Sequence, residues 1–147
     1  MTMPSALMGS WQFWALLSAM FAALTAIFAK IGVSDINSDF ATLIRTCVVI
    51  AVLAAIVAGT SQWQPLSEIS GRTWVFLALS GLGTGASWLC YFRALKLGDA
   101  ARVAPVDKLS IVFVAVLGVV FLGEKLSPLN WLGVGLFGAG IWLVAMK

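Results

Sequence analysis

Five long apolar runs, separated by short polar turns, constrain this chain more than any other feature. The hydrocarbon core of a bilayer is about 30 Å thick, and roughly 20 apolar residues of helix are needed to cross it. Runs of that length cover most of the 147 residues. The sequence therefore predicts an all-α, polytopic membrane protein with five transmembrane helices, over about residues 11–33, 40–58, 73–97, 100–122 and 129–146.

The composition agrees with this interpretation. The chain is 61% hydrophobic and 10% charged, and its mean hydropathy is +1.03, which lies outside the range of soluble domains. The lipid bilayer is thus the expected surrounding. The net charge of +3 is spread thinly through the loops, so no nucleic-acid partner is expected. The first apolar run is longer than the core of a signal peptide, and we expect that helix to be retained.

Several residues in the turns predict where the helices begin and end. We expect Asp39 to cap the second helix, Gly98 to end the third in a left-handed turn, and Asp99 to start the fourth. Ser127 and Pro128 have the residue types of a helix cap and a first helical position.

Charged residues crowd the joint between the third and fourth helices. They are Arg93, Lys96, Asp99, Arg102, Asp107 and Lys108. At about 1.5 Å per residue, Asp107 and Lys108 lie roughly 10 to 13 Å along the fourth helix, where charge is costly unless paired or solvated. Two interpretations remain open: a lysine that snorkels beside a headgroup-level aspartate, or a polar site facing a water-filled cavity.

Other polar residues fall on possible cavity faces of the helices. Ser18 and Thr25 follow an inward stripe of the first helix, although both could simply bond to their own backbone or to a neighbouring helix. Arg45 lies about one and a half turns into the second helix, and either snorkels or points into a cavity. The candidate substrate-binding residues are Lys108, Asp107, Tyr91, Trp88, Ser18, Thr25 and Arg45.

The chain lacks the residues that most catalytic sites need. The chain has no histidine, which excludes Ser-His-Asp sites and the common metal sites, and it has no phosphate-binding loop for ATP. The stretch from Gly133 to Gly138 has the spacing of a dinucleotide fingerprint, but it lies in the middle of a span with no preceding strand. We therefore expect no enzyme, cofactor or metal site. A pair of intramembrane carboxylates is the one enzymatic alternative left open.

Two stretches resemble the drug/metabolite transporter superfamily. One runs Tyr-Phe-Arg-Ala-Leu-Lys-Leu-Gly-Asp-Ala over residues 91–100 and leads to Val-Ala-Pro over residues 103–105; the other runs Phe-Leu-Gly-Glu-Lys-Leu-Ser over residues 121–127 and is followed by the glycines of the fifth helix. Together they resemble one EamA-type domain of five helices, over residues 1–147. Typical members carry two such domains in inverted orientation around a central cavity and move metabolites or drugs without ATP.

The chain departs from that pattern at two places. Residues 106–110 read Val-Asp-Lys-Leu-Ser, where many family members have an apolar segment with a further proline. The first helix also lacks the carboxylate that the small multidrug exporters of the superfamily use. Asp107 and Lys108 are thus the residues that most distinguish this chain from the generic pattern.

The resemblance implies a secondary transporter of a small organic solute. Because one repeat supplies only one wall of an alternating-access site, we expect a homodimer, inverted or parallel, in the inner or plasma membrane. An accessory subunit that does not transport, or a component of a lipid-carrier flippase, is the alternative.

The loop charges favour one orientation weakly. With the N-terminus outside, two cations lie outside, Arg72 and Lys125. The cations inside are then Lys30, Arg45, Arg93, Lys96, Arg102, Lys108 and Lys147. Setting aside Arg45, Arg93 and Lys108 as intramembrane leaves four against two, a bias small enough to permit insertion both ways.

Overall fold

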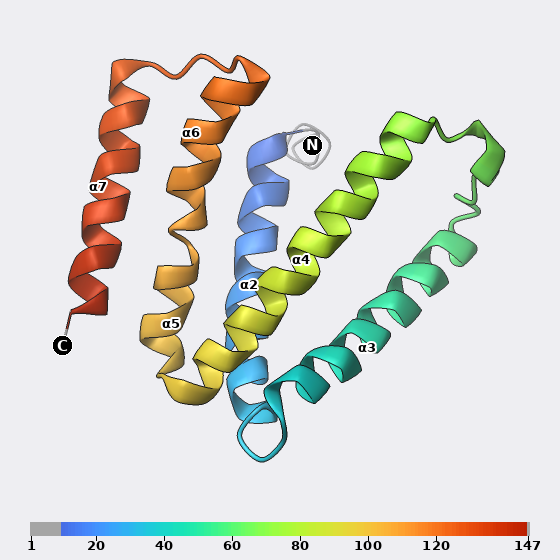
Figure 1. Cartoon of the computed structure of the whole chain (residues 1–147), viewed down its shortest axis with the longest axis horizontal. Helices are drawn as coiled ribbons and strands as arrows, with labels where there is room; N and C mark the ends of the chain where they lie inside the picture. Colours follow the sequence, from blue (N-terminus) through green and yellow to red (C-terminus); the bar gives the residue numbers. More distant parts are fainter. Residues whose placement is uncertain (1–9, 147) are drawn as a thin grey trace, which may run out of the picture. The chain divides into compact units, whose positions relative to one another are not determined.

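The computed structural model describes residues 10–146, which are mostly helical and contain no strand (Figure 1). The elements are α2 (Trp11–Gly32), α3 (Ser38–Gly59), the short 3-10 helix η1 (Leu66–Glu68), α4 (Gly71–Leu97), α5 (Ala100–Asp107), α6 (Ser110–Leu122) and α7 (Pro128–Ala145). The all-α prediction is confirmed. Residues 1–9 and Lys147, which enters the charge count above, lie outside the described residues.

Five segments are long and apolar enough to cross a membrane, as predicted. They are Trp11–Gly32, Ser38–Gly59, Gly71–Leu97, Ala100–Leu122 and Pro128–Ala145. Large apolar side chains point outward along all of them; Phe21, Leu82 and Phe121 are each at least 60% exposed. Such surface is stable in lipid and costly in water. The chain is a multi-pass membrane protein.

The helix starts follow capping chemistry, with one correction to the sequence-based prediction. Asn37, and not Asp39, caps α3: its side-chain oxygen accepts from the backbone nitrogens of Asp39 at 2.8 Å and Phe40 at 3.2 Å. Once Asn37 satisfies these N–H groups, the Asp39 carboxylate can bind elsewhere. At α7, Ser127 accepts from the nitrogen of Asn130 at 3.2 Å and Pro128 is the first helical residue, as predicted.

The helix ends hold a second correction. Gly98 does not adopt the predicted left-handed conformation; among the glycines of residues 10–146, Gly123 does, with φ of 69° as it ends α6. Asp99 occupies the predicted cap position of α5, but its side chain makes no capping hydrogen bond. The turn from α4 to α5 is therefore short enough to need no left-handed residue.

The fourth span is interrupted, which the sequence did not predict. Lys108 and Leu109 separate α5 from α6 and are held by tight i to i−3 bonds: the nitrogen of Lys108 donates to the Pro105 carbonyl, and that of Leu109 to the Val106 carbonyl, each at 3.0 Å. Pro105 lies three residues before the break and weakens the preceding turn, because proline inside a helix has no N–H to donate and its ring clashes with the carbonyl one turn earlier.

The described residues divide into two compact units, here called the α3–α4 unit (residues 29–97) and the α5–α7 unit (residues 10–28 and 98–146). In the first, α3 packs against α4, and Val33 and Leu95 are fully buried. In the second, α7 packs against α5 and α6. A Cβ added at Gly138 of α7 would lie 3.7 Å from the Val112 side chain of α6. This is ordinary contact distance, so α6 and α7 pack against each other at Gly138 with room for a methyl group.

Candidate functional site

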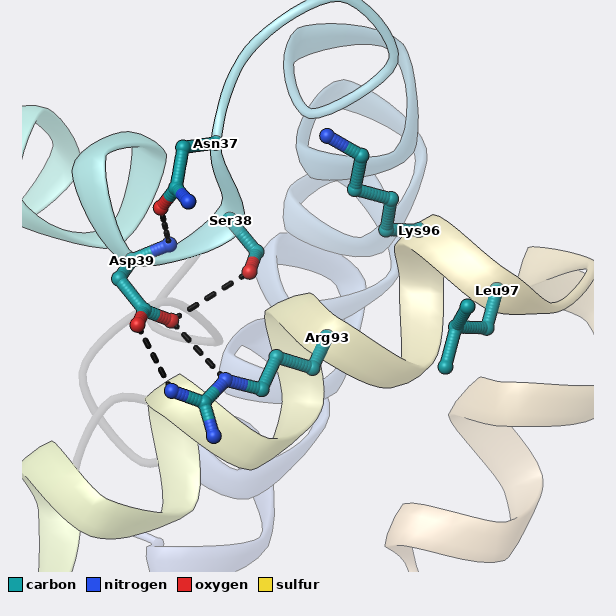
Figure 2. A pocket seen from close by; sticks show the side chains of 6 residues that line it. All are labelled: Asn37, Ser38, Asp39, Arg93, Lys96 and Leu97. Carbon is teal, nitrogen blue, oxygen red and sulfur yellow. Dashed lines mark hydrogen bonds and ion pairs between the residues drawn. The ribbon is translucent and has the colours of Figure 1, made fainter.

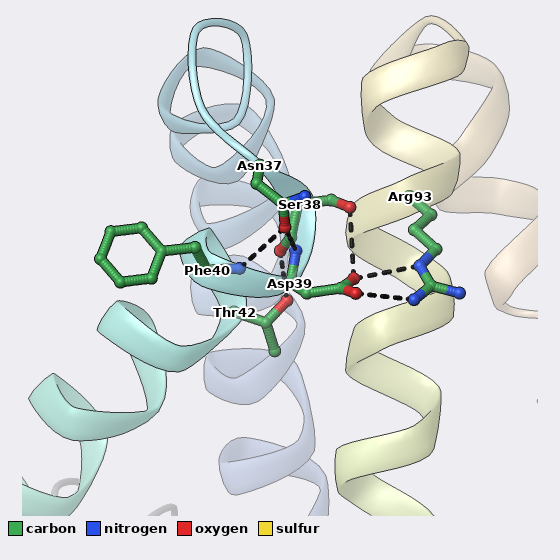
Figure 3. A network of polar contacts seen from close by, with 6 residues as sticks. All are labelled: Asn37, Ser38, Asp39, Phe40, Thr42 and Arg93. Carbon is green, nitrogen blue, oxygen red and sulfur yellow. Dashed lines mark hydrogen bonds and ion pairs between the residues drawn. The ribbon is translucent and has the colours of Figure 1, made fainter.

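An ion pair fastens α3 to α4 near the start of α3 (Figure 3). The guanidinium of Arg93 donates from Nε to Asp39 Oδ1 at 3.0 Å and from Nη2 to Oδ2 at 2.7 Å. Such a fork-to-carboxylate contact fixes direction as well as distance. The pair thus sets the register of the two antiparallel helices.

Two lysines bind backbone carbonyls at the same end of the unit. Lys30 Nζ donates to the Leu95 carbonyl at 2.7 Å, and Lys96 Nζ donates to the Ile36 carbonyl. The Leu95 carbonyl belongs to the last turn of α4, where carbonyls have no partner within the helix and the dipole favours cations. These lysines therefore serve the folded structure.

An open hollow of about 330 Å³ lies beside the ion pair (Figure 2). Its lining residues are Asn37, Ser38, Asp39, Arg93, Lys96 and Leu97. None of the seven candidate residues lines it, and its three charged side chains all bind groups of the chain itself. The sequence-based prediction missed this cluster. The signal that could have found it is an acid in the first turn of one helix, Asp39, and a base near the end of the next, Arg93.

Three of the candidate residues gather deeper in the α3–α4 unit. The guanidinium carbon of Arg45 lies 4.0 Å from the centroid of the Trp88 ring and 5.5 Å from that of Phe92. Tyr91 interacts electrostatically with Arg45. Trp88, Tyr91 and Phe92 share one face of α4, since residues three and four apart on a helix are neighbours. We call Arg45 and these three residues the arginine–aromatic cluster.

The register shows that Arg45 does not reach toward the membrane surface. Asp39 of α3 lies opposite Arg93 of α4. Because the two helices are antiparallel, Arg45, six residues after Asp39, lies opposite the residue six positions before Arg93, which is next to Trp88. Six residues correspond to about 9 Å of helix. Snorkelling toward the ion-paired end would bring the guanidinium closer to Phe92 than to Trp88, and the distances show the reverse. Arg45 thus stays at its own depth.

The aromatic rings do not balance the cost of this charge. Stacking a guanidinium on an aromatic ring contributes about 0.5 to 2 kcal/mol, whereas a charged residue within a span costs about 2.5 to 3.5 kcal/mol or more. Within residues 10–146 no carboxylate pairs with Arg45; the ion pairs there are Arg93 with Asp39 and Lys108 with Asp107. Water or a bound anion is left to satisfy its N–H groups.

Asp107 and Lys108 form their own pair in the α5–α7 unit. Lys108 Nζ lies 3.0 Å from Asp107 Oδ2, and their side chains are 50% and 31% exposed, with the lysine the more exposed. Both flank the break between α5 and α6. The pair neutralises itself locally, which lowers the cost of holding two charges inside a span.

Ser18 and Thr25 are not drawn into that pair. Ser18 is exposed and Thr25 half-buried, and no hydrogen bond of the described residues joins either one to Asp107 or Lys108. Their place in a binding site stays a prediction. On α4, the Thr84 hydroxyl donates to the Ser80 carbonyl at 2.9 Å, so this hydroxyl bonds to the backbone of its own helix.

Comparison with known proteins decides the family. The EamA-like transporter family matches residues 9–146. The chain belongs to this family. Membership confirms the resemblance found in the sequence, supports a transporter role in the cell membrane, and points away from an enzyme.

Three curated relatives are themselves named as uncharacterized transporters. A Sinorhizobium protein, in the cobO 3′ region, is 75% identical over 93% of this chain and 97% of its own length. The Bacillus subtilis protein YxxF is 25% identical over 96% of this chain but 44% of its own length. The Pseudomonas aeruginosa protein PA0485 is 31% identical over 62% of this chain and 30% of its own length. The chain thus spans less than half of these last two relatives. No solved structure matches it.

Proposed function

We propose that this EamA-family chain is a secondary transporter of a small organic solute, and that it works by alternating access as a dimer of five-helix units. The observation that carries the proposal is the interrupted fourth span, with Asp107 and Lys108 at the break. In secondary transporters, broken helices with polar groups near the midplane form substrate and coupling-ion sites.

Energetics support a working role for the break. A membrane helix gains nothing in stability from a proline, two adjacent charges and a loss of regular hydrogen bonding well inside an apolar span. The Asp107–Lys108 pair is short at 3.0 Å yet half-exposed on the lysine side. A solute with its own charges can therefore replace one partner without leaving a buried charge alone.

The architecture of the family supports the dimer. Alternating access needs two repeats that rock around a shared site, and one repeat supplies one wall. The chain covers 44% of the Bacillus subtilis relative, about the share expected of one repeat in a two-repeat transporter. A methyl group added at Gly133, Gly135 or Gly140 would meet no atom of the described residues within 4 Å, which leaves room for a second helix against α7.

Transport in membrane vesicles tests the proposal. Vesicles from cells producing the chain are offered a panel of amino acids, organic acids, amines and sugars, with and without a proton or sodium gradient, and uptake is measured by mass spectrometry. We expect at least one solute to accumulate. Lys108→Ala should abolish that uptake while the protein stays inserted, because Asp107 then lacks its counter-charge.

Controls separate a transport defect from a folding defect. The double variant Asp107→Asn with Lys108→Gln removes the pair without leaving a lone charge, and it should also be inactive. Arg102→Gln removes a cation earlier on the same span and should transport normally. Full uptake by Lys108→Ala would reduce the lysine to a snorkelling residue. If no solute moves and one membrane protein consistently co-purifies, the accessory-subunit alternative gains support; movement of lipid-linked sugars alone would favour the flippase.

A further inference from the structure

We infer that Arg45, in the arginine–aromatic cluster, is the group that binds the anionic end of the solute, and that the solute therefore carries a carboxylate or a similar oxyanion. This inference rests on the proposed transport function and adds the chemical class of the substrate. It depends on a different unit of the chain from the Asp107–Lys108 pair.

The first argument is the missing counter-charge. Arg93, only about 9 Å away along the helix pair, has a bidentate carboxylate partner in Asp39. Lys108 has Asp107. Arg45 lies more than a turn inside a span, and no acid within residues 10–146 pairs with it. A cation in that position is stable when an anion or water binds its N–H groups.

The second argument is the geometry of stacking. The guanidinium carbon of Arg45 lies over the Trp88 ring, 4.0 Å from its centroid, a distance at which guanidinium groups commonly stack on aromatic faces. In such stacking the five N–H donors, which lie in the plane of the guanidinium, point past the ring. Stacking on Trp88 thus orients the fork without using its hydrogen bonds, and a planar carboxylate matches that fork with two parallel bonds.

The third argument is depth. The guanidinium lies nearer Trp88 than Phe92, so it stays away from the ion-paired end of the unit. A lipid phosphate would reach it from the membrane surface, whereas a solute would reach it from within the transport path. The shared chemistry is an oxyanion, and the position favours the solute.

Binding can be measured separately from transport. Purified chain is placed in nanodiscs of neutral phosphatidylcholine, and acetate, benzoate, succinate and inorganic phosphate are titrated while tryptophan fluorescence and thermal unfolding are followed. Acetamide and benzamide are the uncharged counterparts. We expect at least one of the anions to bind and its amide not to.

Variants assign the binding to Arg45. Arg45→Gln should weaken it roughly ten- to a hundredfold, because a charge-assisted bidentate contact is lost, and Arg45→Lys should weaken it less. Arg72→Gln is the matched control: Arg72 also lies over a ring, that of Phe76 at 5.8 Å, but in the first turn of α4. It should bind as the wild type does. If Arg45→Gln does not insert into the membrane, the loss of anion binding in Arg45→Lys tests the inference in its place.

Three results of the binding experiment overturn the inference. One is that no anion in the panel binds; another is that binding is equal in wild type and Arg45→Lys and Arg45→Gln. The third is that anionic lipid, added as phosphatidylglycerol, is retained by wild type and lost in Arg45→Gln while no soluble anion binds. Arg45-dependent binding without any solute movement in vesicles would instead contradict the transport function and leave an anion site. Vesicle transport that Arg45→Gln leaves unchanged would contradict this inference alone.

Discussion

Arg93 and Arg45 lie on the same pair of helices, but different groups contact their guanidinium groups. Arg93 shares its fork with the Asp39 carboxylate near the end of α4. Arg45 lies over the rings of Trp88 and Phe92 and has no carboxylate partner within residues 10–146. The first arrangement holds two helices in register, and the second is the one that we propose for anion binding.

The capping residue of α3 gives a prediction at this scale. Asn37→Ala removes the side-chain acceptor for two backbone N–H groups and should lower the free energy of unfolding by about 1 kcal/mol. Thermal unfolding of the purified protein in detergent measures the change. Asn37→Asp keeps an acceptor and is the control, which should unfold close to the wild type. Equal stability of Asn37→Ala and wild type would contradict the assignment.

Residue chemistry also explains which sequence predictions failed. Asp39 and Asn37 are both good cap residues, and the sequence alone does not show that a base on another helix will engage the aspartate. Likewise Gly98 fits a left-handed turn by type, but the turn between α4 and α5 closes without one. Local propensity placed both turns correctly, but it did not predict that Asn37 caps α3 or that Gly98 avoids the left-handed conformation.

At the scale of elements, the five spans were predictable and the break in the fourth was not. Hydropathy and length place each span because the bilayer sets both. Pro105 is visible in the sequence, but a proline in the first turns of a helix is often tolerated, and only the backbone hydrogen bonds show that the helix yields at Lys108 and Leu109. Similarly, the sequence indicated three separate candidates, Arg45, Trp88 and Tyr91. Only the register of α3 against α4 shows that they lie together.

Pro105 carries the element-scale prediction. Pro105→Ala restores an N–H that can donate to the Ala101 carbonyl, so α5 should become more regular and the break that follows it at Lys108 and Leu109 less favourable. We expect transport to fall while thermal stability is kept or raised. Uptake in vesicles and unfolding in detergent measure the two effects.

The control for that variant is Pro128→Ala, because Pro128 is at the first position of α7, where proline costs little. It should leave transport unchanged. Wild-type transport by Pro105→Ala would show that the break is incidental.

At the scale of the whole molecule, the proposed mechanism requires two five-helix units around one path. The described side chains leave much apolar surface exposed, which either lipid or a second copy covers. The bias of loop charges is four against two, small enough for a chain to insert in both orientations. An inverted homodimer would then reproduce the two-domain arrangement of typical family members.

A reporter fused to the C-terminus tests this arrangement. We expect signal both from alkaline phosphatase, which is active outside, and from a fluorescent protein that folds only inside. Removing the two outer cations, Arg72→Gln with Lys125→Gln, should strengthen the charge bias and give signal inside only. Signal on one side in the unmodified chain would rule out the inverted homodimer and favour a parallel assembly or a partner chain.

Counterflow in liposomes that contain only this purified chain is the decisive test of whether it transports by itself. Liposomes loaded with an excess of an unlabelled solute that was taken up by the vesicles are diluted into the labelled solute. We predict transient accumulation of label by wild type, none with Lys108→Ala, and a loss for anionic solutes with Arg45→Gln. Liposomes in which the inserted, folded wild-type protein accumulates no label would contradict the proposal that the chain alone is a transporter.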